Sequence, residues 1–395
     1  MTTPLWPLAA IALLASVGAA QLTDPDRRLP VEPDWRTVPQ LTPEQQRRRE
    51  DDARTRLGEH GLAVSLLGVA FIPPAHESLG EIGGLSGLAH LKDNRFLVVS
   101  DNSKQPAIYE LRITLRPTDN PERFALTPEL APAPMTVEHA SVDAESVAAL
   151  PGEAGIVVGY ERPPTVAVYR SRSDGPWVTE RLDIPAALTD EIRHNRAFES
   201  VAVRSLDSGV EIWAATEAAP KTDGEEAGAA AGTRCRVLAF TGRDFSFDRE
   251  MVYLTEPGPE GPLKVAFNSL AEFCALPDGR FLALERGLSP LAGYHANIYI
   301  LDGATRAPAE GGVLPELIKG LLASVRDLGV HTLTNLEGMA LGPRIAELTG
   351  DNEQKGRLLL LVADNNFGSD GIRESQVVAL RIVGLDPQDL EDEGD

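Results

Sequence analysis

Cysteine and histidine are scarce in this chain. Its 395 residues include two cysteines, Cys235 and Cys274, and seven histidines. They do not have the ligand spacing of a zinc site, so the sequence does not support a zinc centre of the usual kind. The two cysteines either form a disulfide in an oxidising compartment or stay as buried thiols on strands, and both alternatives remain open.

Positive charge is also in deficit. The chain has 37 Lys and Arg residues against 59 Asp and Glu residues, which gives a formal net charge of −22 at pH 7. Nucleic acids and anionic membranes are bound by basic surfaces, so we expect neither of them as a partner.

Long amphipathic helices are nearly absent. The exception is residues 315–326, which we expect to form a helix inserted before the last repeat. Apolar residues make up 43% of the chain, enough to bury a substantial core. The length of the repeat region suits one domain of about 320 residues.

What the chain does contain is a short phrase that recurs five times. The copies are Ser86-Gly-Leu-Ala89, Glu145-Ser-Val-Ala148, Glu199-Ser-Val-Ala202, Glu272-Phe-Cys-Ala275 and Glu337-Gly-Met-Ala340. Each is followed by a turn and an apolar run that ends in an acid, at Asp101, Glu161, Glu217, Glu285 and Asp364. A further strand-forming run closes each unit. A repeat of roughly 55–75 residues built from short strands predicts an all-β fold, a β-propeller with five legible blades. Six blades is the alternative count.

Each unit is expected to open with an antiparallel hairpin. In Leu276-Pro-Asp-Gly-Arg280, Pro fixes φ and Gly accepts positive φ, which favours a tight turn between two apolar runs. The two acids of a unit then lie side by side at the open end of the hairpin. The predicted neighbours are Glu145 with Glu161, Glu199 with Glu217, Glu272 with Glu285, and Glu337 with Asp364. In a radial arrangement these acids surround one mouth of the central channel.

The two ends of the chain differ from the repeats. Residues 1–20 are apolar, too short to span a bilayer comfortably, and end in Gly18-Ala-Ala20, which predicts a secretory signal peptide. Residues 21–60 are interpreted as a charged, proline-containing linker, residues 61–384 as the propeller and residues 385–395 as an acidic tail. Residues 63–71 are expected to close the final blade as its outer strand. We therefore expect a periplasmic or secreted protein with no membrane insertion after signal cleavage.

The chemistry of the mouth follows from its carboxylates. Clustered carboxylates repel one another and bind hard cations, and Ca²⁺ accepts irregular sets of oxygen ligands. The predicted metal ligands are Asp101, Glu145, Glu161, Glu199, Glu217, Glu272, Glu285, Glu337, Asp364 and Asn365. Arg162, Arg196 and Arg286 are expected to neutralise acids or to hold an oxyanion such as a phosphate. The insertion at residues 221–232 follows Glu217 and is expected on the same side.

Several strings together resemble the phytase-like family, whose description refers to an esterase-like activity of phytase. They are Gly83-Gly-Leu-Ser-Gly-Leu-Ala89, Asn195-Arg-Ala-Phe-Glu-Ser200, Leu276-Pro-Asp-Gly-Arg-Phe-Leu-Ala-Leu-Glu-Arg286, Asn335-Leu-Glu-Gly338 and Val362-Ala-Asp-Asn-Asn-Phe367. The similarity covers roughly residues 62–383. It implies an exported bacterial propeller related to calcium-dependent propeller phytases, with a small-molecule ester or phosphoester as substrate. Asn195 and Asn335 join the three arginines as predicted substrate-binding residues, and Glu145, Glu199 and Glu337 are the predicted catalytic residues.

The leading hypothesis is thus an exported, calcium-assisted ester or phosphoester hydrolase. The alternative is a non-catalytic, calcium-stabilised propeller that binds a ligand or a protein partner, in which the acids are structural. A third hypothesis makes Ser86 the nucleophile of a serine esterase, although its surroundings lack the G-x-S-x-G elbow.

Overall fold

The computed structural model describes residues 61–102, 107–133, 143–170, 178–259, 266–289, 293–303, 314–368, 371–386 and 389. Within these ranges the elements are strands, the short helices α3 (Ala186–Thr189) and α4 (Ile345–Thr349), and the 3₁₀ turns η1 (Pro151–Glu153) and η2 (Asn366–Gly368). No described helix is long and apolar enough to cross a bilayer. The predicted signal peptide, the linker and most of the acidic tail lie outside the described residues.

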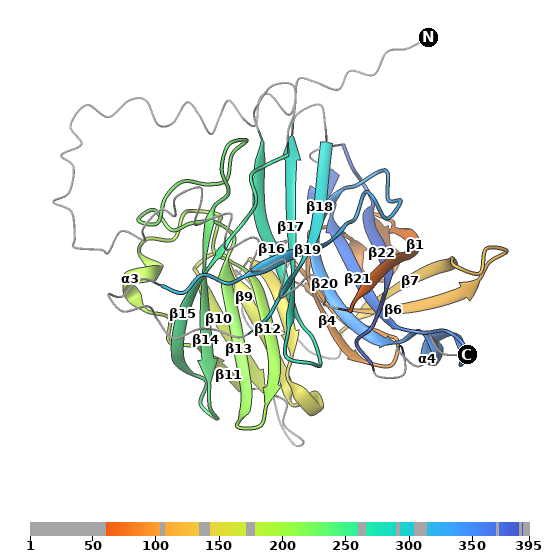
Figure 1. Cartoon of the computed structure of the whole chain (residues 1–395), viewed down its shortest axis with the longest axis horizontal. Helices are drawn as coiled ribbons and strands as arrows, with labels where there is room; N and C mark the ends of the chain where they lie inside the picture. The colour runs from red at the N-terminus through yellow and green to blue at the C-terminus, as the bar shows by residue number, and fades with distance from the viewer. Residues whose placement is uncertain are drawn as a thin grey trace, which may run out of the picture.

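Four of the antiparallel sheets have their strands in sequence order (Figure 1). The first contains β4 (Leu85–Lys92), β5 (Arg95–Ser100), β6 (Ala107–Pro117) and β7 (Phe124–Pro132). The second contains β8 (Ala144–Ala149), β9 (Gly155–Tyr160), β10 (Thr165–Arg170) and β11 (Val178–Arg181). The third contains β12 (Phe198–Leu206), β13 (Gly209–Thr216), β14 (Arg234–Thr241) and β15 (Ser246–Leu254). The fourth contains β16 (Phe267–Ala275), β17 (Phe281–Ser289), β18 (Gly293–Leu301) and β19 (Lys319–Ser324).

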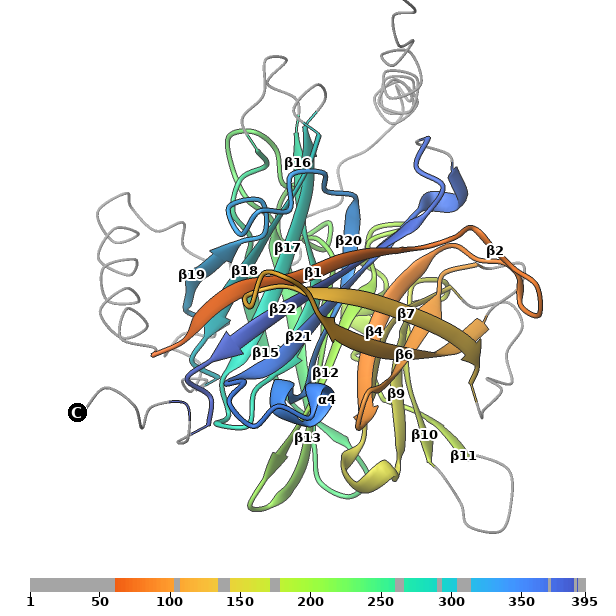
Figure 2. The same cartoon turned by 90° about the vertical axis from the view of Figure 1, so that its right-hand side faces the viewer.

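The fifth sheet combines strands from both ends of the described chain. Strands β20 (Asn335–Arg344), β21 (Arg357–Asp364) and β22 (Ser375–Val383) pair in sequence order, and β1 (Ala63–Ile72) pairs with β22. Figure 2 shows β1 running alongside β22. A small hairpin of β2 (Ala75–His76) and β3 (Gly80–Glu81) lies between β1 and β4 in the sequence.

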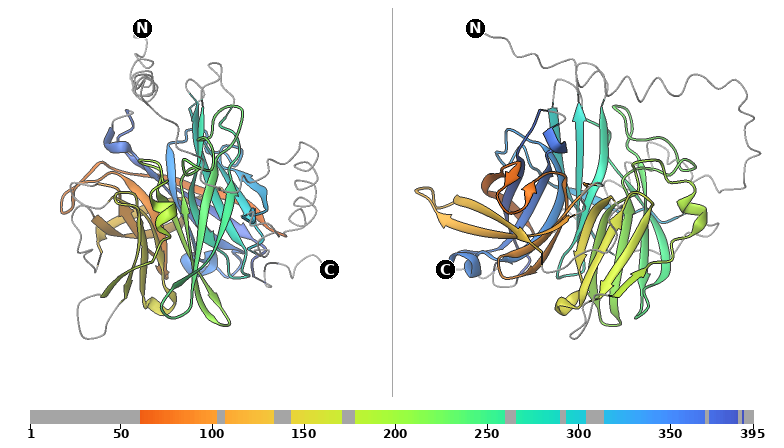
Figure 3. Two further views of the ribbon diagram at one scale, coloured as in Figure 1. Left: turned by 90° about the vertical axis from the view of Figure 1, so that its left-hand side faces the viewer. Right: turned by 180° about the vertical axis from the view of Figure 1, so that it is seen from behind.

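The five sheets are arranged around one axis. The innermost strands β4, β8, β12, β16 and β20 each contact the next in this order, and β20 contacts β4. Figure 3 shows neighbouring sheets side by side, with β8–β11 in yellow and β12–β15 in green. The fold is therefore a five-bladed β-propeller. This confirms the predicted all-β propeller, with the count at five rather than six.

Five hydrophobic clusters fill the interfaces, one between each pair of neighbouring sheets. In β21, Leu358 and Leu360 belong to the cluster shared with the first sheet, whereas Leu359 and Leu361 belong to the cluster shared with the fourth. Successive side chains of a strand point to opposite faces, so both faces of this sheet are buried. That is why the repeats contain continuous apolar runs instead of alternating ones.

The helix predicted at residues 315–326 is wrong. Lys319–Ser324 form β19, which pairs with β18 and completes the fourth sheet. Without β19 the outer edge of β18 would present unpaired N–H and C=O groups, so sheet pairing outweighs the local helical pattern. The two cysteines are both buried and free. The structure therefore favours the alternative of buried thiols over a disulfide.

Candidate functional site

A β-bulge interrupts every innermost strand. The register shifts between Ala144 and Ser146 in β8, and between Phe198 and Ser200 in β12. It shifts in the same way around Glu337 in β20, at Ser86–Gly87 in β4, and at Ala271 in β16. The inserted residue is thus Glu145, Glu199 or Glu337 in three of the sheets. Bulges re-aim side chains and are over-represented beside active sites.

The second acid of each hairpin has an equally regular place. The residue before each bulge pairs with Ser100, Tyr160, Thr216, Glu285 or Ala363. The next residue along the returning strand is Asp101, Glu161, Glu217, Arg286 or Asp364. Four sheets therefore place a carboxylate here, and the fourth sheet places an arginine.

We call this end of the propeller the acidic mouth. It comprises Ser86, Asp101, Asp143, Glu145, Glu161, Glu199, Glu217, Arg286, Glu337 and Asp364.

The structure does not place Glu272 and Glu285 side by side in the acidic mouth, contrary to the prediction. The bulge falls at Ala271, so Glu272 lies one residue beyond it and pairs with Leu284. Its Oε1 accepts a hydrogen bond from its neighbour's backbone, Phe273 N–H, at 3.1 Å. Glu285 instead accepts hydrogen bonds from Tyr253 Oη at 2.7 Å and Asn268 Nδ2 at 2.6 Å, and it pairs with Lys319.

The predicted pairs Glu145–Glu161 and Glu199–Glu217 do come together, and Asp364 is near enough to Glu337 to raise its pKa. Asp143, Glu145 and Glu161 each offer a carboxylate oxygen within 4.8 Å of the others, and so do Glu161, Glu199 and Glu217. Asp143 is a member that sequence reasoning missed, because it precedes the repeat phrase by two residues in only one unit. All five carboxylates are buried. Glu161 belongs to both groups and joins them into one cluster.

Burial and mutual repulsion dominate the electrostatics of the acidic mouth. Desolvation raises the pKa of Asp101, Glu161 and Glu337 to about 7, with neighbouring carboxylates adding to the rise. The pKa values of Glu145 and Glu199 are raised well above the ordinary range by burial and then by surrounding carboxylates. Such a set is costly when fully ionised unless cations are added.

Three predicted arginines lie among these acids. Arg286 Nη2 is 2.8 Å from Glu337 Oε1 and 3.2 Å from Glu217 Oε1. Arg196 Nη1 is 2.9 Å from Glu217 Oε2, and Arg162 Nε donates to Asp143 Oδ2 at 2.6 Å. The Arg162 and Arg196 side chains are 49% and 33% exposed, against 9% for Arg286. Arg162 and Arg196 are therefore partly exposed to solvent, whereas Arg286 is nearly buried.

The insertion at residues 221–232 lies on this side, as expected. Arg196 bridges Glu217 of the acidic mouth and Glu226 of the insertion, with Nε 2.5 Å from Glu226 Oε1.

The predicted asparagines and Ser86 have mostly structural contacts. Asn335 Nδ2 donates to Glu337 at 2.7 Å, and Ser86 Oγ donates to the same carboxylate at 3.0 Å. Asn365 Oδ1 accepts hydrogen bonds from Gly84 N–H and Phe367 N–H, so it ties two segments together. Ser86 is fully buried, which does not favour its proposed role as a nucleophile.

Three of the five non-glycine residues with positive φ in the described part of the chain lie in loops beside the acidic mouth. Asn195, Asn366 and Phe367 have φ values of 59°, 46° and 49°, a region that non-glycine residues rarely adopt. Gly84 has φ of 60°, and a Cβ there would lie 1.6 Å from Asp101 Oδ1, so only glycine fits against this carboxylate. Residues held in strained conformations cluster at functional sites.

The donor set fits a hard divalent cation. All five clustered side chains offer carboxylate oxygens, the ligands that Ca²⁺ and Mg²⁺ prefer, and no thiolate or imidazole joins them in the groups identified. Glu217 Oε1 is buried and accepts no hydrogen bond among the described residues, although Arg286 pairs with it. A bound cation would compensate the negative charge that the arginines do not neutralise.

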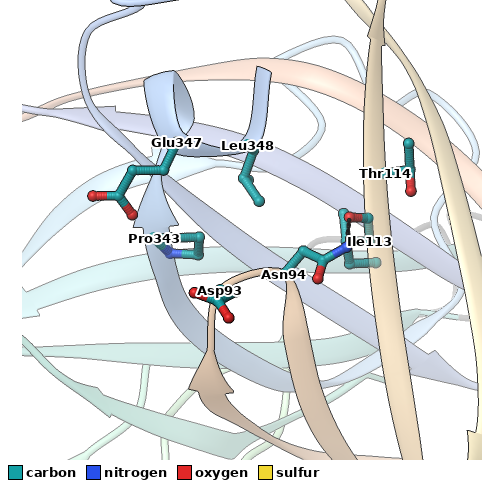
Figure 4. Close-up of a pocket in the computed structure, with 7 residues that line it drawn as sticks. All are labelled: Asp93, Asn94, Ile113, Thr114, Pro343, Glu347 and Leu348. Carbon is teal, nitrogen blue, oxygen red and sulfur yellow. Dashed lines mark hydrogen bonds between the residues drawn. The ribbon is translucent and has the colours of Figure 1, made fainter. Parts of the chain in front are cut away.

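A separate pocket of about 350 Å³ lies at the opposite end of the propeller. It is formed by the β4–β5 turn at Asp93 and Asn94, by β6, and by α4 with Glu347 (Figure 4). None of the residues lining it was predicted as a site residue, and it does not extend to the acidic mouth.

Comparison with known proteins adds the family. Among solved structures, an α-L-arabinofuranosidase from Podospora anserina is 11% identical, with 81% of this chain and 97% of that chain covered and a TM-score of 0.44. A glutaminyl cyclase from Myxococcus xanthus is 9% identical over 82% and 98% of the chains, with a TM-score of 0.39. No match was found among curated proteins. The phytase-like family, described as "Esterase-like activity of phytase", matches residues 80–367, more than half of the chain. The chain therefore belongs to the phytase-like family.

Proposed function

We propose that this protein is an exported, calcium-assisted hydrolase of a small-molecule ester or phosphoester, with its site at the acidic mouth. The observation that supports this is an excess of buried negative charge. The mouth holds eight carboxylates, of which all but Asp101 are buried, and Arg162, Arg196 and Arg286 are the arginines that pair with them. Structural acids are normally paired. Eight carboxylates against three arginines leave an excess of negative charge, which a cationic ligand explains better than a purely structural role.

The cluster that shares Glu161 supplies the cation ligands in this proposal: Asp143, Glu145, Glu161, Glu199 and Glu217. When bound there, calcium supplies Lewis acidity, polarising an ester oxygen and lowering the pKa of a water molecule. Arg162 and Arg196 are partly exposed and hold the anionic part of the substrate. Glu145, Glu199 and Glu337 remain candidates for taking the proton from the attacking water.

The test is ester hydrolysis by chelator-stripped protein with and without added calcium. Substrates are calcium phytate, simple phosphomonoesters and carboxylic esters. A Glu145→Gln/Glu199→Gln variant should lose calcium-dependent release, falling by at least 100-fold if these residues act on the reacting atoms. An Asp93→Asn/Glu347→Gln control removes the same charge from the pocket at the opposite end and should keep the activity.

A second candidate function has its own observation. Glu145, Glu161, Glu199, Glu217 and Glu337 are each at most 8% exposed, which also suits a cation enclosed by protein oxygens. The protein would then be a non-catalytic, calcium-stabilised propeller that binds a ligand or protein partner. Absence of hydrolysis with every substrate, together with a calcium-induced rise in melting temperature, would favour this function over the hydrolase.

A further inference from the structure

Arg286 takes the place of a carboxylate in an otherwise acidic ring. The position in question directly follows the residue of the returning strand that pairs just before the bulge. It is occupied by Asp101, Glu161, Glu217 or Asp364 in the first, second, third and fifth sheets, and by Arg286 in the fourth. We propose that Arg286 is a built-in cation. It occupies the charge-compensating position between Glu217 and Glu337, and so limits added metal ions to the Glu161-centred side of the acidic mouth. This inference rests on the proposed function only in taking the mouth as a cation site.

The contacts of Arg286 are those of a single positive charge shared by two acids. One nitrogen, Nη2, lies 2.8 Å from Glu337 Oε1 and 3.2 Å from Glu217 Oε1. These acids come from the sheets on either side of the fourth sheet. Nη2 donates a hydrogen bond to Glu337 Oε1, whereas Nε is buried and donates none among the described residues. Burial alone would lower its pKa, but Glu337, Glu217 and Glu199 raise it, and the group stays charged.

The two sides of the acidic mouth differ accordingly. Both groups of three converging carboxylates lie on the second and third sheets and share Glu161. On the fifth sheet, Glu337 receives Arg286 and also hydrogen bonds from Asn335 and Ser86. Glu337 is therefore satisfied by protein groups alone. Of the five clustered acids, Glu217 is the one with an ion pair to Arg286, so Asp143, Glu145, Glu161 and Glu199 are the acids left to respond to an added metal ion.

The test is the number of cations bound by chelator-stripped protein, measured by calorimetric titration with Ca²⁺ and checked by Tb³⁺ luminescence. Arg286→Gln should bind one more cation per chain than the wild type. Its melting temperature should fall in chelator and recover in calcium. Arg286→Lys keeps the charge and should retain the wild-type stoichiometry.

A matched control comes from Arg204, whose side chain is 13% exposed and pairs with buried Glu211 at the other end of β13. Arg204→Gln should lower the melting temperature by a similar amount, but calcium should not restore it and the stoichiometry should not change. If Arg286→Gln does not fold, an Arg286→Gln/Glu337→Gln variant also removes the stranded acid and should fold with the wild-type stoichiometry.

The outcomes separate this inference from the proposed function. Unchanged stoichiometry in Arg286→Gln, with a stability loss that calcium does not reverse, overturns the role of Arg286 even if the wild type binds calcium. A wild type that binds no cation, beside an Arg286→Gln variant that binds one, refutes the calcium-assisted hydrolase and supports Arg286 as the built-in cation.

Discussion

Two groups of buried glutamates in this propeller have opposite surroundings. Glu211, near the hairpin end of β13, is 1% exposed and accepts hydrogen bonds from Arg204, Arg249 and Trp213 at 2.5, 2.6 and 2.9 Å. Glu110 on β6 is likewise held by two arginines, and they lower its pKa. These acids are buried because they are paired.

The acidic mouth shows the reverse. Glu145 and Glu199 are 8% and 6% exposed, yet after burial the leading influences on their pKa values are other carboxylates, all of which raise them. The same residue type at the same depth is thus stabilised in one region and frustrated in the other. Such local conflict is expected where a structure serves a ligand more than its own stability.

The largest effect of a single substitution is predicted at Glu211, in the region where the buried acids are paired. Glu211→Ala removes the carboxylate that Arg204, Arg249 and the Trp213 N–H share, and breaking a buried pair in this way costs about 3–5 kcal/mol. Urea unfolding should show this loss equally in chelator and in calcium. A loss that calcium reduced would contradict the separation of the two regions.

The next effect is the pH dependence of the cation-free protein. Asp101, Glu161 and Glu337 have folded pKa values of about 7, whereas unfolded carboxyls ionise near pH 4. Between these values the folded state binds more protons, so stability is full below about pH 4 and is lost as the pH rises through about 7. Between pH 5 and pH 8 in chelator we expect a decrease of about 3 kcal/mol for each such group, up to about 8 kcal/mol for the three together. Calcium should reduce the part contributed by Glu161, which belongs to the clustered carboxylates, and a flat profile in chelator would be inconsistent with crowded carboxylates. Glu110 has a lowered pKa, so its effect on stability has the opposite pH dependence: its contribution to the free energy of unfolding is lost only as the pH falls into the acid range.

A smaller effect is predicted for removing one carboxylate, Glu199, from the acidic mouth. Glu199→Gln eliminates a charge that neighbouring carboxylates oppose, so at pH 8 in chelator the variant should be more stable than the wild type by about 1–2 kcal/mol. It should also show a weaker thermal response to calcium. Differential scanning fluorimetry with and without calcium measures both, and destabilisation in chelator would show that Glu199 is structural.

The smallest effect concerns strain beside the acidic mouth. Phe367 is held at φ 49° with its ring against Gly83 and Gly84. Phe367→Gly relieves a conformation that costs on the order of 1 kcal/mol but removes the ring contact, so stability should change by less than about 1 kcal/mol. Asp93→Gly, at φ 51° in the β4–β5 turn, is the matched control. If the strain serves the site, Phe367→Gly should alter the KM for ester hydrolysis and Asp93→Gly should not.

The sequence predicted most of the acidic mouth because its information is local. Turn chemistry at Leu276–Arg280 and its equivalents defines hairpins, and the open end of a hairpin places Glu145 with Glu161 and Glu199 with Glu217. Asp143 could have been found from the same logic, as an acid two residues before a repeat phrase. The local pattern at residues 315–326 predicted a helix wrongly, because a distant part of the chain determines the structure of this segment. The edge of β18 needs a pairing strand, and Lys319–Ser324 supply it.

The sequence by itself thus determined a repeated all-β propeller with an acidic mouth, because strand period, turns and acid positions are properties of short segments. Only the tertiary structure decided which residues enter the mouth in the fourth sheet. There the bulge falls at Ala271, and a one-residue slip of register changes where every later side chain points. It moves Glu272 and Glu285 out of the carboxylate cluster and brings Arg286 into the ring, which gives the mouth its asymmetry of charge.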